Sequence, residues 1–203
     1  IEQADICLVL IDANEPGTSL DQKIAGLVKE AGKSLIEAVS KWDALDDKTP
    51  YSRDQLAAQL RTDFAFVAWA PLAFTSAVTG QNVAQLFELA LEINERRHQR
   101  MRTVELNRWL RQVVSQRPPA GLRGMTPKLN YIVQEDDQPL PSFKLFGSHV
   151  KFLHWSYRRY LERQLRERWN LAGTPVKFWY LDKHPNKTEH GGRPTTPPQN
   201  PTD

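Results

Sequence analysis

Length and composition allow one or two folded cores, because the chain has 203 residues, of which 40% are hydrophobic. Residues 1–95 carry 7 Lys and Arg against 15 Asp and Glu, whereas residues 96–203 carry 20 against 9. The overall charge of +3 therefore hides a basic second half, which favours a polyanionic partner over a merely solvated surface. The single cysteine, Cys7, excludes an internal disulfide, and no apolar run reaches the roughly 18 residues of a membrane span.

The first half alternates strand-length apolar runs with helical patterns. The predicted elements are strand 6–11, helix 19–31, strand 34–39, helix 52–64, strand 71–74 and a helix from about residue 82. The continuous apolar run 6–11 predicts a strand covered on both faces. This order predicts a parallel sheet with right-handed crossovers. Three strands are about half of an open α/β domain, so we expect the other half to precede Ile1.

The second half has a different pattern. A polar, Arg-rich bridge at 95–102 leads into helix 103–115, strand 128–134, strand 142–146, helix 155–169 and strand 174–181. The order α-β-β-α-β predicts a three-stranded sheet backed by two helices. We divide the chain into an α/β part (1–97), an α+β domain (98–183) and a tail (184–203) whose composition predicts disorder.

Two polar motifs follow predicted strands of the first half. Ser40-Lys41-Trp42-Asp43 comes after the second strand and Thr75-Ser76-Ala77 after the third. Because ligands bind at the carboxyl ends of strands in such sheets, the motifs are expected to meet there. A carboxylate such as that of Asp43 can accept two hydrogen bonds from N1–H and the exocyclic amine of guanine, a donor pair that adenine lacks.

The remaining motif residues complete a guanine pocket. The stem of Lys41 would lie across the base plane, and the backbone N–H of Ala77 would point at the guanine O6. The predicted nucleotide-binding residues are Ser40, Lys41, Trp42, Asp43, Ser76 and Ala77.

A phosphate-binding loop is missing from the sequence. The nearest string, Leu27 to Ser34, runs from a helix into a strand, whereas such a loop runs from a strand into a helix. An Asp-x-x-Gly magnesium motif is also missing, and the five histidines lack metal-ligand spacing. We therefore assign no catalytic and no metal-binding residue, and expect that the chain alone does not hydrolyse GTP.

Lys-x-Asp and Ser-Ala at the ends of successive strands are motifs of translation-type GTPases. Ala4-Asp5, Ile11-Asp12-Ala13, 21–26 and 76–81 resemble the Der (EngA) family of tandem GTPases in particular. Stretches of the second half resemble the KH-like domain of that family: 106–107, 118–119, 128–129, 143–146, 156–162 and 173–175. The resemblance covers about residues 1–183. It implies a partial P-loop-type G domain, lacking its N-terminal half, followed by a small α+β KH-like domain.

The resemblance also implies a function. Family members bind GTP or GDP with Mg²⁺, which residues upstream of this chain would hold, and act in ribosome biogenesis at large-subunit assembly. The implied partners are the large ribosomal subunit with its rRNA and the missing upstream G-domain segments, and the implied location is the ribosome-associated cytoplasm, not a membrane. Two residues depart from expectation: Ser40 replaces the family's Asn, and Glu37 lies in a predicted buried strand, where an unpaired carboxylate is costly.

RNA contacts of the second half are predicted on its last helix. Arg159, Arg163 and Arg166 share one helical stripe and are candidates for RNA phosphates, with solvated surface as the alternative. The string 121–124 fits the Gly-x-x-Gly of KH domains, but it lies between a helix and a strand, so we interpret it as a connecting loop. Four tryptophans could stack bases, but their spacing favours core packing: Trp109, Trp155, Trp169 and Trp179.

Two alternatives are compatible with the sequence. An Era-like GTPase also joins a G domain to a KH domain, but that KH domain keeps a helix–Gly-x-x-Gly–helix, which this chain lacks. A non-enzymatic RNA-binding protein with a vestigial nucleotide fold is the second, and Ser40 and Glu37 favour it.

Overall fold

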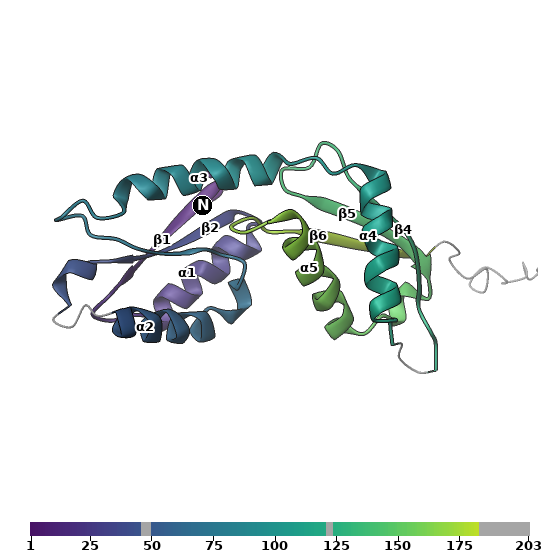
Figure 1. Cartoon of the computed structure of the whole chain (residues 1–203), viewed down its shortest axis with the longest axis horizontal. Helices are drawn as coiled ribbons and strands as arrows, with labels where there is room; N and C mark the ends of the chain where they lie inside the picture. The colour runs from purple at the N-terminus through teal and green to yellow at the C-terminus, as the bar shows by residue number, and fades with distance from the viewer. Residues whose placement is uncertain (46–49, 121–123, 183–203) are drawn as a thin grey trace, which may run out of the picture.

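The computed structural model describes residues 1–45, 50–120 and 124–182, which form two halves side by side (Figure 1). The first half has the predicted β-α-β-α-β-α order: β1 (Ile6–Asp12), α1 (Ser19–Glu30), β2 (Ser34–Ser40), α2 (Pro50–Asp63), β3 (Leu72–Phe74) and α3 (Val83–His98). Its three strands are parallel, in the order β1-β2-β3. In Figure 1, α1 and α2 lie on one side of this sheet and α3 on the other.

The second half has the predicted α-β-β-α-β order. Its elements are α4 (Thr103–Gln116), β4 (Lys128–Gln134), β5 (Ser142–Ser148), α5 (Trp155–Trp169) and β6 (Lys177–Asp182). β4 and β5 are antiparallel, whereas β5 and β6 are parallel. The predicted α/β and α+β classes are thus confirmed. The predicted tail 184–203 and residues 121–123 of the Gly-x-x-Gly string lie outside the described residues.

α1 begins at a capping box that Thr18 and Asp21 form. The hydroxyl of Thr18 accepts a hydrogen bond from the Asp21 amide (3.2 Å), and the Asp21 carboxylate accepts one from the Thr18 amide (3.0 Å). Two otherwise unpaired N–H groups of the first turn are therefore satisfied.

β1 corrects the prediction of a strand covered on both faces. Val9 and Ile11 are buried, whereas Leu8 and Leu10 are 44% and 60% exposed. Further exposed apolar side chains lie on the neighbouring helices: Leu20, Ile24 and Leu27 of α1 and Phe87 and Leu91 of α3. β1 is the edge strand, and no described residue covers these side chains, which we call the apolar surface beside β1.

The predicted polar bridge 95–102 is shorter than expected. Residues 95–98 form the last turn of α3, and Arg97 is buried there instead of solvated. Residues 99–102 link α3 to α4 and are fastened to the end of β4. The Gln134 side chain accepts a hydrogen bond from the Met101 amide (2.8 Å) and donates one to the Gln99 carbonyl (3.0 Å).

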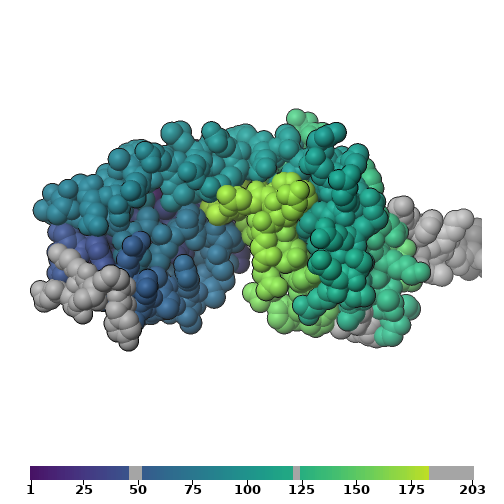
Figure 2. Space-filling view, in the orientation of Figure 1, coloured from purple at the N-terminus to yellow at the C-terminus, as the bar shows by residue number. Residues whose placement is uncertain are grey.

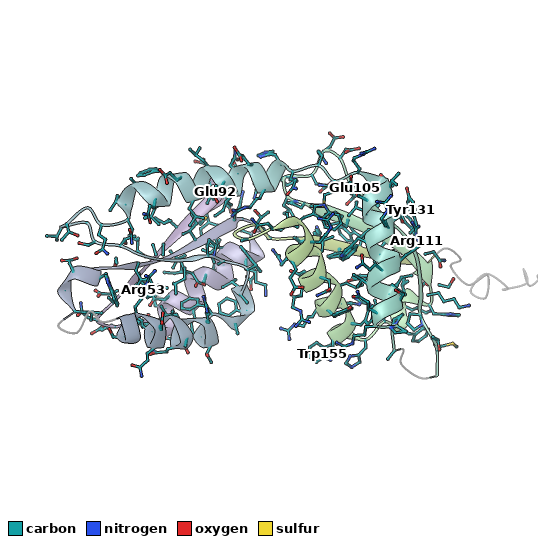
Figure 3. All side chains as sticks on the ribbon, viewed as in Figure 1. Arg53, Glu92, Glu105, Arg111, Tyr131 and Trp155 are labelled. Atoms are coloured by element: carbon teal, nitrogen blue, oxygen red, sulfur yellow. The ribbon has the colours of Figure 1, made fainter. Side chains whose placement is uncertain are left out.

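The core of the second half lies between its sheet and the helices α4 and α5. Trp109 and Trp169 pack edge to face there, with ring centroids 5.6 Å apart, as predicted. Trp155 and Trp179 are 61% and 43% exposed, so core packing was the wrong prediction for these two. Trp155 lies at the first turn of α5 (Figure 3).

Within the described part of the chain, every helix is too short or too polar to cross a membrane.

Candidate nucleotide site and interdomain cleft

The two predicted motifs meet at the carboxyl end of the β1–β3 sheet. The Trp42 amide donates a hydrogen bond to the Thr75 carbonyl (3.1 Å), and the Thr75 amide donates to the Val39 carbonyl (2.7 Å). The Trp42 ring packs edge to face on Phe74, with centroids 4.8 Å apart. The loops after β2 and β3 are therefore held together by backbone bonds and by a buried aromatic pair.

Asp43 carries an unused acceptor in this site. Lys41 takes a left-handed conformation (φ 56°), which turns the chain out of β2 into the short 3₁₀ turn Trp42–Ala44. Atom Oδ1 of Asp43 is buried and accepts no hydrogen bond from any residue that the structure describes. A buried, unpaired acceptor costs about 1–3 kcal/mol, so this oxygen is suited to a donor from a ligand.

The loop after β3 supplies a donor. The Ser76 hydroxyl accepts a hydrogen bond from the Thr79 amide (3.0 Å), and the Ser76 amide donates to the Gln81 carbonyl (3.2 Å). Ser76 is fully buried and shapes the loop, whereas Ala77 beside it is exposed. The Ala77 amide bonds to no acceptor within the described ranges, which leaves it available for a carbonyl oxygen of a base.

Lys41 spans from the end of β2 to the end of β1. Its Nζ lies 2.6 Å from Oδ2 of Asp12, and both side chains are well exposed. The hydrogen bond from Lys41 lowers the pKa of Asp12, and the same bond raises the pKa of Lys41. The aliphatic stem of Lys41 therefore lies along the edge where a base would bind.

Three of the six predicted residues have mainly structural contacts: Ser76, which shapes its loop as described above, and also Trp42 and Ser40. Trp42 is only 6% exposed and belongs to the core. The Ser40 hydroxyl donates to the Ile11 carbonyl of β1 (3.2 Å), so that proton is not free for a nucleotide. The geometry thus concentrates the possible base contacts on Lys41, Asp43 and Ala77.

Glu37 lies in the middle of β2, where the sequence placed a costly carboxylate. It is 4% exposed, and its Oε1 has no hydrogen-bond partner among the residues described. Burial raises the pKa of Glu37 to about 8, so the carboxyl is mostly protonated at neutral pH. It borders a cavity of about 390 Å³ that is otherwise lined by Arg61, Phe64, Val67, Ala68, Ala70, Pro71 and Leu72.

The amino end of the same sheet is joined to the second half. The Leu35 amide of β2 donates to the Gly173 carbonyl (3.0 Å), and the Gly173 amide donates to the Trp69 carbonyl (2.7 Å). A Cβ on Gly173 would lie 2.4 Å from Cδ1 of Ile93, and its φ is +76°. Only glycine fits this place without strain. We call these contacts of Gly173 the joint.

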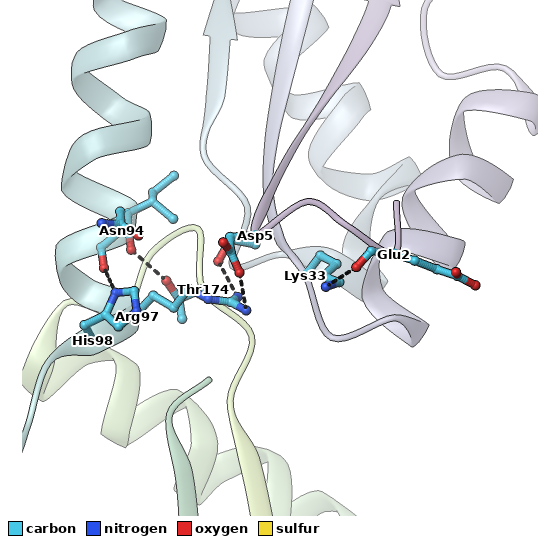
Figure 4. A network of polar contacts seen from close by, with 9 residues as sticks. Glu2, Asp5, Lys33, Asn94, Arg97, His98 and Thr174 are labelled. Atoms are coloured by element: carbon cyan, nitrogen blue, oxygen red, sulfur yellow. Dashed lines mark hydrogen bonds and ion pairs between the residues drawn. The ribbon is translucent and has the colours of Figure 1, made fainter. Parts of the chain in front are cut away.

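Polar side chains surround the joint (Figure 4). The guanidinium of Arg97 is 3.4 Å from both Oγ of Ser34 and Oδ1 of Asp5. Burial lowers the pKa of Arg97, and the charge of Asp5 opposes that shift. The Thr174 hydroxyl lies 3.5 Å from the Ile93 carbonyl of α3. The sequence signalled none of these long-range contacts, although Gly173-Thr174-Pro175 belonged to the resemblance.

The three predicted RNA-contacting arginines differ in their surroundings. Arg159 and Arg163 are exposed. Arg166 is mostly buried: it donates to Glu162 (2.8 and 3.0 Å) and to the carbonyls of Leu171 (2.9 Å) and Thr174 (2.7 Å). The geometry argues against a phosphate contact by Arg166, because its donors already hold the loop that carries the joint.

Comparisons with known proteins agree with this architecture. The protein-family model described as "KH-domain-like of EngA bacterial GTPase enzymes, C-terminal" matches residues 100–180. The chain is 45% identical over 179 residues to GTPase Der of Chloroflexus aggregans, which covers 87% of this chain and 39% of that protein. It is 37% identical over 184 residues to GTPase Der of Thermomicrobium roseum, covering 90% and 40% respectively.

GTPase Der of Prochlorococcus marinus is 41% identical over 184 residues, again 90% of this chain and 40% of that protein. The chain spans about two fifths of the length of the curated relatives it matches. The chain therefore belongs to the GTPase Der (EngA) family. Its partial G domain and KH-like domain correspond to the C-terminal part of the proteins of that family.

Proposed function

We propose that the first half recognises the guanine base of GTP or GDP, and that the second half docks on ribosomal RNA during assembly of the large ribosomal subunit. The nucleotide part is supported by the family and, above all, by the buried, unpaired Oδ1 of Asp43. That atom lies at the carboxyl end of a parallel sheet, next to the loop that presents the Ala77 amide. A cytoplasmic, ribosome-associated location is part of the same proposal.

The proposed base contacts follow from hydrogen-bond chemistry. Asp43 would accept from N1–H and the exocyclic amine, the Ala77 amide would donate to O6, and the stem of Lys41 would cover the ring. Adenine would leave the carboxylate unpaired, which costs orders of magnitude in affinity at such sites. Phosphates and Mg²⁺ would be held by residues outside this chain, so we expect base recognition here without GTP hydrolysis.

A titration with nucleosides tests the base site directly. We expect guanosine to bind in the millimolar range, at least about tenfold more tightly than adenosine, as measured by NMR shifts of the Asp43 and Ala77 amides. Asp43→Asn should lose guanosine and gain xanthosine, because an amide can donate to the C2 oxygen that replaces the exocyclic amine. Equal binding of guanosine and adenosine by the unmodified chain would refute the proposal.

The apolar surface beside β1 supports a further partner. Leu8, Leu10 and the exposed side chains of α1 and α3 are of the kind that additional strands and helices of a G domain cover. We propose that upstream G-domain segments of the same protein pack on this surface.

A second candidate function rests on Ser40 and Glu37. The Ser40 hydroxyl is used by the Ile11 carbonyl, and Glu37 is buried without a partner among the described residues. A vestigial nucleotide fold in an RNA-binding protein is the alternative that these two features favour. This alternative would be supported if the chain bound RNA but bound guanosine and adenosine equally well.

A further inference from the structure

A cleft lies between the two halves, next to α1, the segment 65–69 and α5. It has a volume of about 410 Å³ and is lined by Lys29, Ala65, Phe66, Ala68, Trp69, Arg159, Glu162, Arg163 and Arg166. Figure 2 shows the hollow between the first half and α5. Both halves contribute to it: α1 and the segment 65–69 form one wall, and α5 forms the other.

The cleft has an excess of positive charge. Among the described residues that line it, Glu162 alone carries a carboxylate, and this group accepts two hydrogen bonds from Arg166. Lys29 and Arg159 make no ion pair within the described ranges, and Arg163 makes only a long, exposed contact of 3.6 Å to Glu167. Cations held close together without a counter-ion attract an anionic ligand.

Aromatic rings lie beside these cations. Nζ of Lys29 is 5.8 Å from the ring centroid of Phe66, and the guanidinium of Arg166 is 5.5 Å from that of Trp69. Both rings are half-buried. A strip of cations beside aromatic faces is typical of surfaces that bind single-stranded nucleic acid, where phosphates meet the cations and bases contact the rings. An acidic peptide would use the charges but not the rings.

We propose that this cleft binds a segment of single-stranded RNA. Phosphates contact Lys29, Arg159 and Arg163, and a base packs on Phe66. This inference rests on the proposed RNA docking, but it moves the site from the KH-like half alone to a surface that both halves form. Arg166 is a positioning residue, because it holds the loop that carries Gly173 and thereby sets the width of the cleft.

Fluorescence anisotropy with a labelled, unstructured uridine oligonucleotide of about 12 nucleotides tests the site. For the full chain we expect Lys29→Ala and Arg159→Ala each to weaken binding about fivefold at 0.1 M salt. Each should reduce the slope of log affinity against log salt by about 0.7. The double variant should combine both losses, while the melting temperature stays unchanged.

The matched control is the double variant Arg108→Ala and Arg111→Ala on α4. It removes the same charge from exposed positions of the KH-like half; Figure 3 shows Arg111 on the far side of that half from α1 and α2. We expect this control to bind RNA nearly as the parent does. An equal loss in the control would overturn the proposal, because the binding would then depend only on net charge. The proposal would also be overturned if an oligoglutamate displaced the labelled oligonucleotide as well as unlabelled RNA does.

Two further variants separate contact from positioning. Phe66→Leu keeps an apolar side chain but removes the aromatic ring, so it should weaken RNA binding while leaving the salt slope unchanged. Arg166→Lys should reduce the hydrogen-exchange protection of the Gly173 amide, which Arg159→Ala should not. A chain that prefers guanosine but whose RNA binding ignores all cleft variants would refute the cleft and leave the nucleotide proposal intact.

Discussion

The two ends of the β1–β3 sheet are built for different purposes. At the amino end, Gly173 of the second half accepts a hydrogen bond from Leu35 of β2 and donates one to the Trp69 carbonyl. At the carboxyl end, Asp43 and Ala77 keep polar groups without partners among the described residues. In a parallel sheet the loops at the carboxyl end diverge and can receive a ligand. The opposite end is consequently free to serve as a structural joint.

The largest expected effect is at the amino end. Gly173→Ala places a Cβ 2.4 Å from Ile93 at a positive φ, and should cost about 3 kcal/mol of unfolding free energy in urea titrations. The matched control at the carboxyl end is Gly80→Ala, where φ is a similar +74° but no atom of the described residues lies within 4 Å of the added Cβ. It should cost about 1 kcal/mol. Equal costs would show that the joint contributes no more than backbone strain.

Glu37 lies between the two ends and gives a prediction about pH. Its carboxyl keeps its proton in the folded state up to about pH 8, whereas the unfolded chain loses it near the ordinary value of 4.5. The folded state is therefore progressively destabilised as the pH rises from 4.5 to about 8. Glu37→Leu should remove this slope and add about 2 kcal/mol at pH 8. Urea titrations at several pH values test this, and a slope that persists in the variant would assign it to another group.

Arg97 should contribute less to the free energy of unfolding than its burial suggests. Its hydrogen bonds are long, at 3.4 Å, and its desolvation is only partly repaid by Asp5. Replacing a buried charge by an apolar side chain of similar length is often neutral, so Arg97→Met should change stability by less than about 1 kcal/mol. Arg97→Ala, which also loses the packing of the stem, should cost about 2 kcal/mol. If both variants lower the melting temperature equally, the ion pair with Asp5 is the contact that stabilises the fold.

The smallest effect is expected at the carboxyl end. Lys41→Ala removes an exposed ion pair, and such pairs contribute little to stability, so the unfolding midpoint should stay the same. The pKa of Asp12 should rise towards its ordinary value, which NMR titration of that carboxyl would detect. Guanosine binding should weaken although stability does not. A large shift of the midpoint would instead make Lys41 a structural residue.

The order of the strands and helices was predictable because apolar runs and helical stripes depend on local periodicity. The meeting of the two motifs was predictable because carboxyl ends of parallel strands share one edge. The exposure of Leu8 and Leu10 was not predictable, because an apolar run does not show which other elements cover the strand. The roles of Gly173 and Lys29 were not predictable either, because they depend on contacts between residues far apart in the sequence. The same holds for the burial of Trp42, which packs on Phe74 at the end of β3.

The linker between the halves has a consequence for how the joint opens. Only residues 99–102 separate α3 from α4, and Gln134 fastens them to β4. Even fully extended, four residues reach about 14 Å, so a broken joint would leave the facing ends of α3 and α4 within roughly that distance. Tethering at such a distance corresponds to an effective concentration in the millimolar range or higher. The joint therefore recloses by an intramolecular encounter, and its occupancy is independent of protein concentration.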